Sequence, residues 1–272
     1  MLARMRHLMH NLPYHWACSM FGAVLSVGAQ AAMAQEASNL PLSRHWRVCL
    51  GVPVPPFVTL DAKHPGFSEK LLVESANQAG LSVEIEAYPL KRCRQRLALG
   101  QTDATMAAAT ANNQAELQFP MQAGEVDTNR RVTKIQLLWI KRKDSALDWD
   151  GQSLRGGDAD QVVVGTRASF RAATEALMKL GLKVDDVAFD VPQLLRKLAA
   201  GRVDLAVVAK AEMQTHLPNP EREGLQVLAT PFLTNNLYLA LRPGQSAARQ
   251  AQAEAWWDVI GRLREKAEFL PR

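Results

Sequence analysis

Apolar and polar residues alternate along the first half of the chain in two different rhythms. Short runs that are apolar at every second position, or throughout, predict strands at 46–51, 81–87 and 104–109. Stretches with apolar residues at helical spacing predict helices at 66–79 and 90–99. The order strand, helix, strand, helix, strand predicts parallel strands joined by right-handed crossovers, and therefore an α/β fold.

The second half shows the same two rhythms. Before it lies a segment, 119–131, which we expect to carry the chain from one half to the other. The pattern then predicts strands at 134–141, 161–165, 184–190, 203–208, 225–229 and 237–241, and helices at 170–180, from about 192, and at 246–267. The chain therefore reads as two consecutive α/β units.

One short sequence motif occurs in both halves. Leu97–Asp103 and Leu198–Asp204 share the pattern L-A-x-G-x-x-D, and each is followed by a strand-like run. In both, a glycine in the left-handed conformation is expected to close a helix before the chain turns into the sheet. We expect Asp103 and Asp204 to accept hydrogen bonds from backbone donors at these turns rather than to form a catalytic carboxylate pair. Two similar units predict two lobes with a ligand cleft between them.

The first 34 residues have the features of a secretory signal peptide. Arg4 and Arg6 precede an uncharged run at 16–34 that ends in Ala32-Met33-Ala34, an A-x-A cleavage site. The small residues of this run favour cleavage over the alternative, an uncleaved membrane anchor. We therefore expect a mature chain that begins at Gln35 and lies in the periplasm.

Charge and cysteine content narrow the possible functions. Removal of Arg4 and Arg6 lowers the formal charge from +5 to +3. The remaining basic residues are spread along the chain without interleaved aromatic residues, so we expect no nucleic-acid partner. Cys49 and Cys93 remain, and in an oxidising compartment they predict one disulfide, the alternative being two buried free thiols. No histidine has ligand spacing to either cysteine, so we predict no metal site and no cofactor.

Several short pieces, in order, resemble one known family. They are Pro55-Pro56-Phe57, Gly66-Phe67, the two copies of the repeated motif, Phe119-Pro120, and Val164-Gly165 with Ala168-Ser169. From about residue 46 to its end the chain resembles the extracytoplasmic solute-binding proteins of amino-acid ABC importers. The resemblance implies a two-lobed periplasmic-binding-protein type 2 fold, with lobe 1 at 44–122 plus 236–272 and lobe 2 at 123–235. It also implies a monomer that closes over a small solute and docks on a permease in the inner membrane.

Two departures from that family concern the ligand. The family holds an α-carboxylate with an arginine in the stretch that corresponds to 110–116, and this chain has none there. The family holds the α-ammonium with an aspartate near the position of Ala209-Lys210, which carries no acid here. Loss of a bidentate guanidinium and of a counter-charge predicts that the ligand is not an ordinary α-amino acid held in the ordinary way.

Ligands in open α/β sheets bind beyond the carboxyl ends of the strands, and this rule selects the loops after the predicted strands. In these loops Phe57 would form an apolar wall, Thr110 would hold polar ligand atoms, and Thr166, Arg167 and Ser169 would bind an anion at a helix N-terminus. The resemblance adds Arg92, at the start of a helix near the cleft rim in the family geometry, and Asn113, near the position of the family's arginine, which could donate a hydrogen bond. The structural alternatives are core packing for Phe57, a turn for Thr110, a helix cap for Ser169 and a solvated surface for Arg167. With Arg92 and Arg167 in the cleft, a carboxylate-bearing solute is favoured over a cationic one.

Catalytic motifs are missing from the sequence. It contains no G-x-S-x-G, H-E-x-x-H or P-loop pattern, so we assign no catalytic residue and expect no enzyme. Two alternatives share the expected fold. One is a sensor or accessory protein that signals to a membrane partner. The other is an enzyme like the dehydratases of cyclic carboxylic acids, for which Glu116 is the one candidate general acid.

Overall fold

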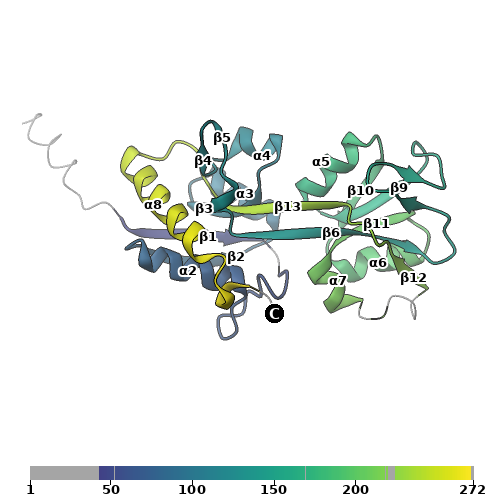
Figure 1. The fold of residues 1–272 in the computed structure, drawn as a ribbon, viewed down its shortest axis with the longest axis horizontal. Helices are drawn as coiled ribbons and strands as arrows, with labels where there is room; N and C mark the ends of the chain where they lie inside the picture. The colour runs from purple at the N-terminus through teal and green to yellow at the C-terminus, as the bar shows by residue number, and fades with distance from the viewer. Residues whose placement is uncertain (1–42, 52, 169, 218, 220–223, 271–272) are drawn as a thin grey trace, which may run out of the picture. The chain divides into compact units, whose positions relative to one another are not determined.

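Strands from both halves of the chain form one nine-stranded sheet (Figure 1). The computed structural model describes residues 43–51, 53–168, 170–217, 219 and 224–270, so the predicted signal peptide lies outside the described residues. The strand order is β10-β9-β11-β6-β13-β3-β1-β2, and β12 pairs with β6. The strands are β1 (His45–Leu50), β2 (Ser82–Ala87), β3 (Ala104–Ala108), β6 (Thr133–Arg142), β9 (Val163–Arg167), β10 (Lys183–Ala188), β11 (Leu205–Ala209), β12 (Leu225–Val227) and β13 (Leu233–Leu241). The parallel strands expected of each half are confirmed, because β1 pairs in parallel with β2 and β3, and β9 with β10 and β11.

Helices lie against this sheet. They are α2 (Phe67–Gln78), α3 (Leu90–Ala98), α4 (Ala111–Glu116), α5 (Arg171–Lys179), α6 (Val191–Ala199), α7 (Lys210–His216) and α8 (Ala247–Leu263). The sequence pattern did not predict α4 and α7, which have six and seven residues. Two turns or fewer are too short to show a helical period. In the described part of the chain, no helix has the length and apolarity needed to span a membrane.

Two long antiparallel strands join the halves of the sheet. The first part of β6 pairs with the first part of β13, from Thr133 opposite Leu237 to Leu137 opposite Leu233. The remainder of β6 pairs with β11, and the remainder of β13 pairs with β3. Each of these strands therefore contributes hydrogen bonds to both halves (Figure 1).

The segment 119–131 was expected to carry the chain from the first half to the second, but it stays with the first half. It contains a small hairpin of β4 (Met121–Gln122) and β5 (Glu125–Val126), followed by the 3-10 turn η1 (Thr128–Arg130). Arg130 donates from Nη1 to Glu254 of α8 at 2.6 Å. The segment therefore lies beside the terminal helix, and the passage begins at β6. The other short elements are β7 (Asp148–Trp149), β8 (Leu154–Arg155) and the 3-10 turn η3 (Ala267–Phe269).

Tryptophan side chains hold α8 in place. Trp256 and Trp257 are completely buried, with Ile260 and Leu263 on the same helix. The indole of Trp256 donates to the Ser75 hydroxyl of α2 at 2.8 Å, and that of Trp257 donates to the backbone carbonyl of Leu239 at 2.7 Å. Each ring thus buries a large apolar surface while its one polar atom stays paired. The helix expected near the end of the chain is confirmed.

The repeated sequence motif has the same structure in both copies. Gly100 and Gly201 adopt φ angles of 68° and 67°, in the left-handed region that closes a helix. Asp103 accepts a hydrogen bond from the backbone N–H of Arg47 at 2.8 Å, and Asp204 accepts one from the N–H of Val163 at 2.9 Å. The expected role of both aspartates at backbone donors is therefore confirmed.

Replacement of Asp103 should test this role. We expect Asp103→Ala to lower the free energy of unfolding by about 1–3 kcal/mol, because it leaves a strand N–H without its acceptor. Asp103→Asn keeps an oxygen acceptor and should recover part of the loss. The measurement is urea unfolding followed by tryptophan fluorescence. Equal stability of Asp103→Ala and the wild-type protein would contradict the assignment.

The predicted disulfide is present. Cys49 of β1 and Cys93 of α3 are bonded with an S–S distance of 2.01 Å, and both are buried. Next to it, the Thr105 hydroxyl of β3 donates to the backbone carbonyl of Cys49 at 2.7 Å. The bond therefore attaches α3 to the centre of the first half of the sheet, and the alternative of two free thiols is excluded in this structure.

Candidate functional site

A cavity of about 130 Å³ opens where two pairs of parallel strands end, one pair from each half of the sheet. The last residues of β1, β3, β9 and β11, which are Leu50, Ala108, Arg167 and Ala209, all line it. We call this cavity the central pocket. Its position follows the rule that ligand sites in α/β sheets lie beyond the carboxyl ends of the strands. Both halves of the chain contribute to its walls.

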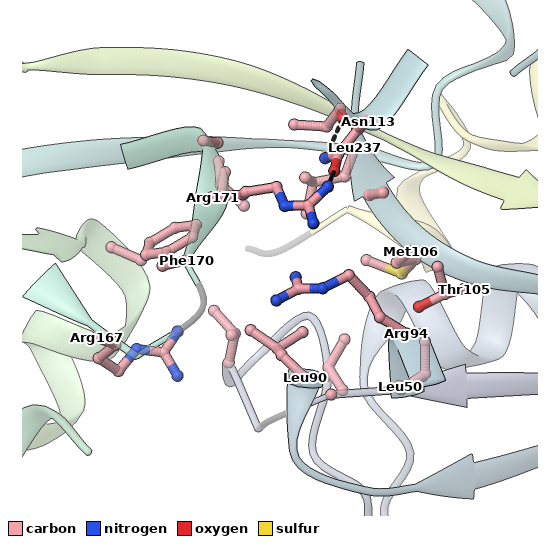
Figure 2. Close-up of a pocket in the computed structure, with 18 of the residues that line it drawn as sticks. Leu50, Leu90, Arg94, Thr105, Met106, Asn113, Arg167, Phe170, Arg171 and Leu237 are labelled. Carbon is pink, nitrogen blue, oxygen red and sulfur yellow. Dashed lines mark hydrogen bonds between the residues drawn. The ribbon is translucent and has the colours of Figure 1, made fainter. Parts of the chain in front are cut away.

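Three arginines project into the central pocket. Arg94 comes from α3, Arg167 from the end of β9 and Arg171 from the start of α5. Figure 2 shows the guanidinium groups of Arg94 and Arg171 directed toward each other from opposite walls, with Arg167 beside Phe170. None of the described residues that line the pocket is Asp or Glu. The lining therefore presents positive charge to any ligand.

Arg171 is held by residues of α4. Its Nη1 donates to Glu116 Oε2 at 2.8 Å and to Asn113 Oδ1 at 3.2 Å. The Asn113 amide in turn donates to the backbone carbonyl of Ala108 at 2.9 Å. A second contact between the same helices joins the Thr110 hydroxyl to Glu175 of α5 at 3.0 Å. These contacts connect residues 55 to 65 positions apart and bring the two halves together beside the pocket.

Arg94 is half-buried on the side of α3 that faces the pocket. Burial lowers the pKa of its guanidinium, and the positive charge of Arg171 lowers that pKa further, whereas Glu116 raises it. An arginine stays protonated despite such a shift. The two guanidinium groups carry like charges and face each other across the pocket. An anion placed between them would relieve that repulsion.

Arg167 is almost entirely buried and paired with a buried acid. Its Nη2 lies 3.1 Å from Glu212 Oε1, and the two side chains are 9% and 3% exposed. The guanidinium carbon is 5.5 Å from the centre of the Phe170 ring. Burial raises the pKa of Glu212, and Arg167 acts in the opposite direction. The Oε2 atom of Glu212 has no partner among the described residues.

Apolar side chains form the rest of the central pocket. The larger ones come from both halves of the chain: Leu50, Val54, Phe57, Val58, Leu90, Met106, Leu117, Ile135, Phe170 and Leu237. Buried polar groups among them are satisfied internally, as at Thr105. A site with this lining would hold an apolar ligand body and fix its charged group at the arginines.

The structure brings together some of the residues predicted from the sequence. Phe57, Asn113 and Arg167 line the central pocket. Phe57 also packs against the core of the first half, so both of its expected roles apply. The disulfide partner Cys93 holds the helix that carries Arg94.

The other predicted residues lie elsewhere. Arg92 is exposed and stacks 5.0 Å from the centre of the Tyr88 ring, because it projects from a different side of α3 than Arg94. Thr110 caps α4 and faces a neighbouring groove. Thr166 is fully buried in β9 and does not line the pocket. Ser169 lies outside the described residues.

Sequence reasoning missed Arg94 and Arg171. A signal for Arg94 was present, since Cys93 and Leu97 mark the buried side of the helix, and position 94 follows Leu90, which also lines the pocket, at helical spacing. Arg171 is the first residue of α5, four positions after Arg167. Its role became visible only through its contact with Glu116, because no local pattern links residues so far apart.

The described lining of the pocket supplies groups that can bind a ligand. The pocket offers fixed guanidinium donors and an apolar wall. The described residues contain no group of three or more His, Cys, Asp or Glu side chains that could hold a metal. Glu116, the candidate general acid, is ion-paired with Arg171 and does not line the central pocket.

Solved structures of other proteins have a similar arrangement of strands and helices. An ancestral arginine-binding protein bound to arginine matches with a TM-score of 0.61 and 16% identity, over 84% of this chain and 96% of that one. The GluR0 ligand-binding core from Nostoc punctiforme, in complex with L-glutamate, matches with a TM-score of 0.59 and 18% identity, over 82% and 95%. The chain has the two-lobed fold of the periplasmic binding proteins. This confirms the fold class expected from the sequence.

A third structure with this periplasmic-binding-protein fold belongs to a different functional class. A histidine kinase sensor domain with similarity to periplasmic binding proteins matches with a TM-score of 0.62 and 18% identity, over 84% of this chain and 93% of that one. At the level of sequence, no protein-family model and no curated protein matches the chain. The fold is thus shared by ligand-binding proteins and by a sensor domain of a histidine kinase.

Proposed function

We propose that this protein is an extracytoplasmic solute-binding protein whose central pocket captures a small carboxylate-bearing solute with an apolar body. The observation that carries the proposal is the convergence of Arg94, Arg167 and Arg171 on one otherwise apolar cavity at the strand ends. Guanidinium groups match the planar geometry of a carboxylate and can bind it with two hydrogen bonds. A solute with an ammonium group would meet only positive charge in the described lining.

The mechanism of this proposal is lobe closure. The lobes would be the two parts of the chain on either side of the paired strands β6 and β13, and they would move about these strands. A ligand that contacts Arg94 on one side and Arg171 on the other binds the closed state better than the open state. Such a ligand shifts the population toward closure. The expected partner of the closed state is a permease of an ABC importer in the inner membrane, and the expected protein is a periplasmic monomer.

The pocket arginines test the proposal directly. Short linear, branched and aromatic carboxylates would be screened by thermal shift, each beside its neutral amide and its amine. We expect carboxylates alone to raise the melting temperature, because a ligand of the native state stabilises it. Arg94→Gln and Arg171→Gln should each weaken the best carboxylate by roughly ten- to a hundred-fold in calorimetry, the worth of a charged hydrogen bond.

Lys91→Gln is the matched control. Lys91 is an exposed cation on the same helix as Arg94 and does not line the pocket. Its replacement should leave the affinity unchanged. Binding of the amines in preference to the carboxylates, or equal losses in all three variants, would overturn the proposal.

A sensor or accessory role is the second candidate function. It is favoured by the structural match to a histidine kinase sensor domain. The same pocket chemistry would serve it, but the closed state would contact a membrane receptor in place of a permease. Affinity capture with the ligand-saturated protein, followed by identification of the membrane protein retained, separates the two roles.

A further inference from the structure

Glu116 places a negative charge against Arg171, one of the arginines that line the central pocket. It lies at the end of α4, and its Oε2 accepts from Arg171 Nη1 at 2.8 Å across the contact between α4 and α5. Its charge also acts on Arg94, in the direction opposite to that of Arg171. One acid of the protein therefore interacts with two of the three guanidinium groups that line the pocket.

In the ion pair between Arg171 and Glu116, a ligand can take the place of Glu116. The Glu116 side chain is 54% exposed and that of Arg171 is 28% exposed. Ion pairs with this exposure contribute little net free energy, since water and salt screen them. In contrast, Arg167 is paired with the buried Glu212, which cannot move away without leaving a buried charge. The two acids thus differ: Glu212 is a permanent counter-charge and Glu116 an exchangeable one.

We propose that Glu116 sets the charge of the ligand: by occupying Arg171 it disfavours solutes with two carboxylates relative to solutes with one. The inference rests on the proposed function. Its physical basis is that Glu116 repels a bound ligand in proportion to the ligand's negative charge. A second carboxylate of the solute would also compete with Glu116 for Arg171. Removal of this one charge therefore strengthens binding of a dicarboxylate more than binding of a monocarboxylate.

The test compares acids that share a carbon skeleton. Wild-type protein and Glu116→Gln would be titrated by calorimetry with butanoate and succinate, pentanoate and glutarate, and hexanoate and adipate. We expect Glu116→Gln to change the affinity ratio by roughly tenfold in favour of the dicarboxylate of each bound pair. Because Glu116 is largely exposed, the melting temperature of the free protein should stay close to the wild-type value.

Glu175→Gln is the matched control. Glu175 lies in the same contact between α4 and α5, where it accepts from Thr110, but it faces the neighbouring groove and does not line the central pocket. An unchanged ratio in Glu116→Gln, or the same change in Glu175→Gln, would overturn the inference while monocarboxylate binding upheld the proposed function. Failure of every carboxylate in this set and in the wider screen to bind the wild-type protein would overturn both.

Discussion

Loss of the Cys49–Cys93 disulfide is expected to lower the free energy of unfolding by about 4 kcal/mol. The two cysteines are 44 positions apart, so the bond closes a long loop in the unfolded chain and restricts its conformations. The loop contains β2, α2 and the start of α3, and the bond also joins α3 to β1 in the folded protein. The measurement is urea unfolding of the Cys49→Ala/Cys93→Ala variant beside the wild-type protein.

The same variant should show a local effect at α3. The buried residues of this helix are Cys93 and Leu97, so the disulfide supplies half of its buried anchors. We expect backbone amides of α3 to exchange with deuterium faster in the variant, and those of α8, which is anchored by buried tryptophans, to change less. Wild-type protein treated with a reductant should reproduce both effects. Equal stability of the oxidised and reduced forms would contradict the prediction.

Breaking the buried Arg167–Glu212 ion pair is expected to lower the free energy of unfolding about as much as loss of the disulfide does. Glu212→Ala should lower the free energy of unfolding by about 3–5 kcal/mol, because it leaves the Arg167 guanidinium buried without a counter-charge. The matched control is the double variant Arg167→Met/Glu212→Leu, which replaces both charges by apolar groups. That variant should be close to the wild-type protein in thermal unfolding, and a loss as large as that of Glu212→Ala would contradict the explanation.

The pH dependence of stability provides a second measurement on this pair. Burial raises the pKa of Glu212 above its value in the unfolded chain. The native state therefore binds a proton more readily than the unfolded state. The stability gained from this group is complete below the unfolded pKa, at about 4.3, and is lost as the pH rises through the folded pKa. The stability of wild-type protein minus that of Glu212→Gln should fall over this interval.

Much of the fold could be predicted because its signals are local. Apolar runs and helical stripes gave the strands and longer helices of both halves, and the glycines at 100 and 201 correctly marked helix ends. The two aspartates that follow them were correctly interpreted as turn residues. The passage between the halves was misplaced, because 119–131 has no feature that distinguishes a crossing segment from a hairpin packed on α8.

The candidate site was only partly predictable. The rule on strand ends selected the edge of the sheet at which the central pocket lies, and Phe57, Asn113 and Arg167 line that pocket. It did not select Arg94, the arginine of α3 that lines the pocket. Arg92 and Arg94 are neighbours in sequence, but two residues turn a helix by about 200°, so they project in nearly opposite directions. The phase of α3 decides which of them enters the pocket.

The sequence by itself determined the succession of elements, the two-unit organisation, the cysteine pair and the edge of the sheet at which the central pocket lies. Each depends on residues that are near one another in the chain or on rules of chain topology. Tertiary structure alone decided that Arg94, Arg167 and Arg171 share one pocket and that Glu116 neutralises one of them. The physical reason is that these charges meet through packing of distant helices, which local periodicity does not encode.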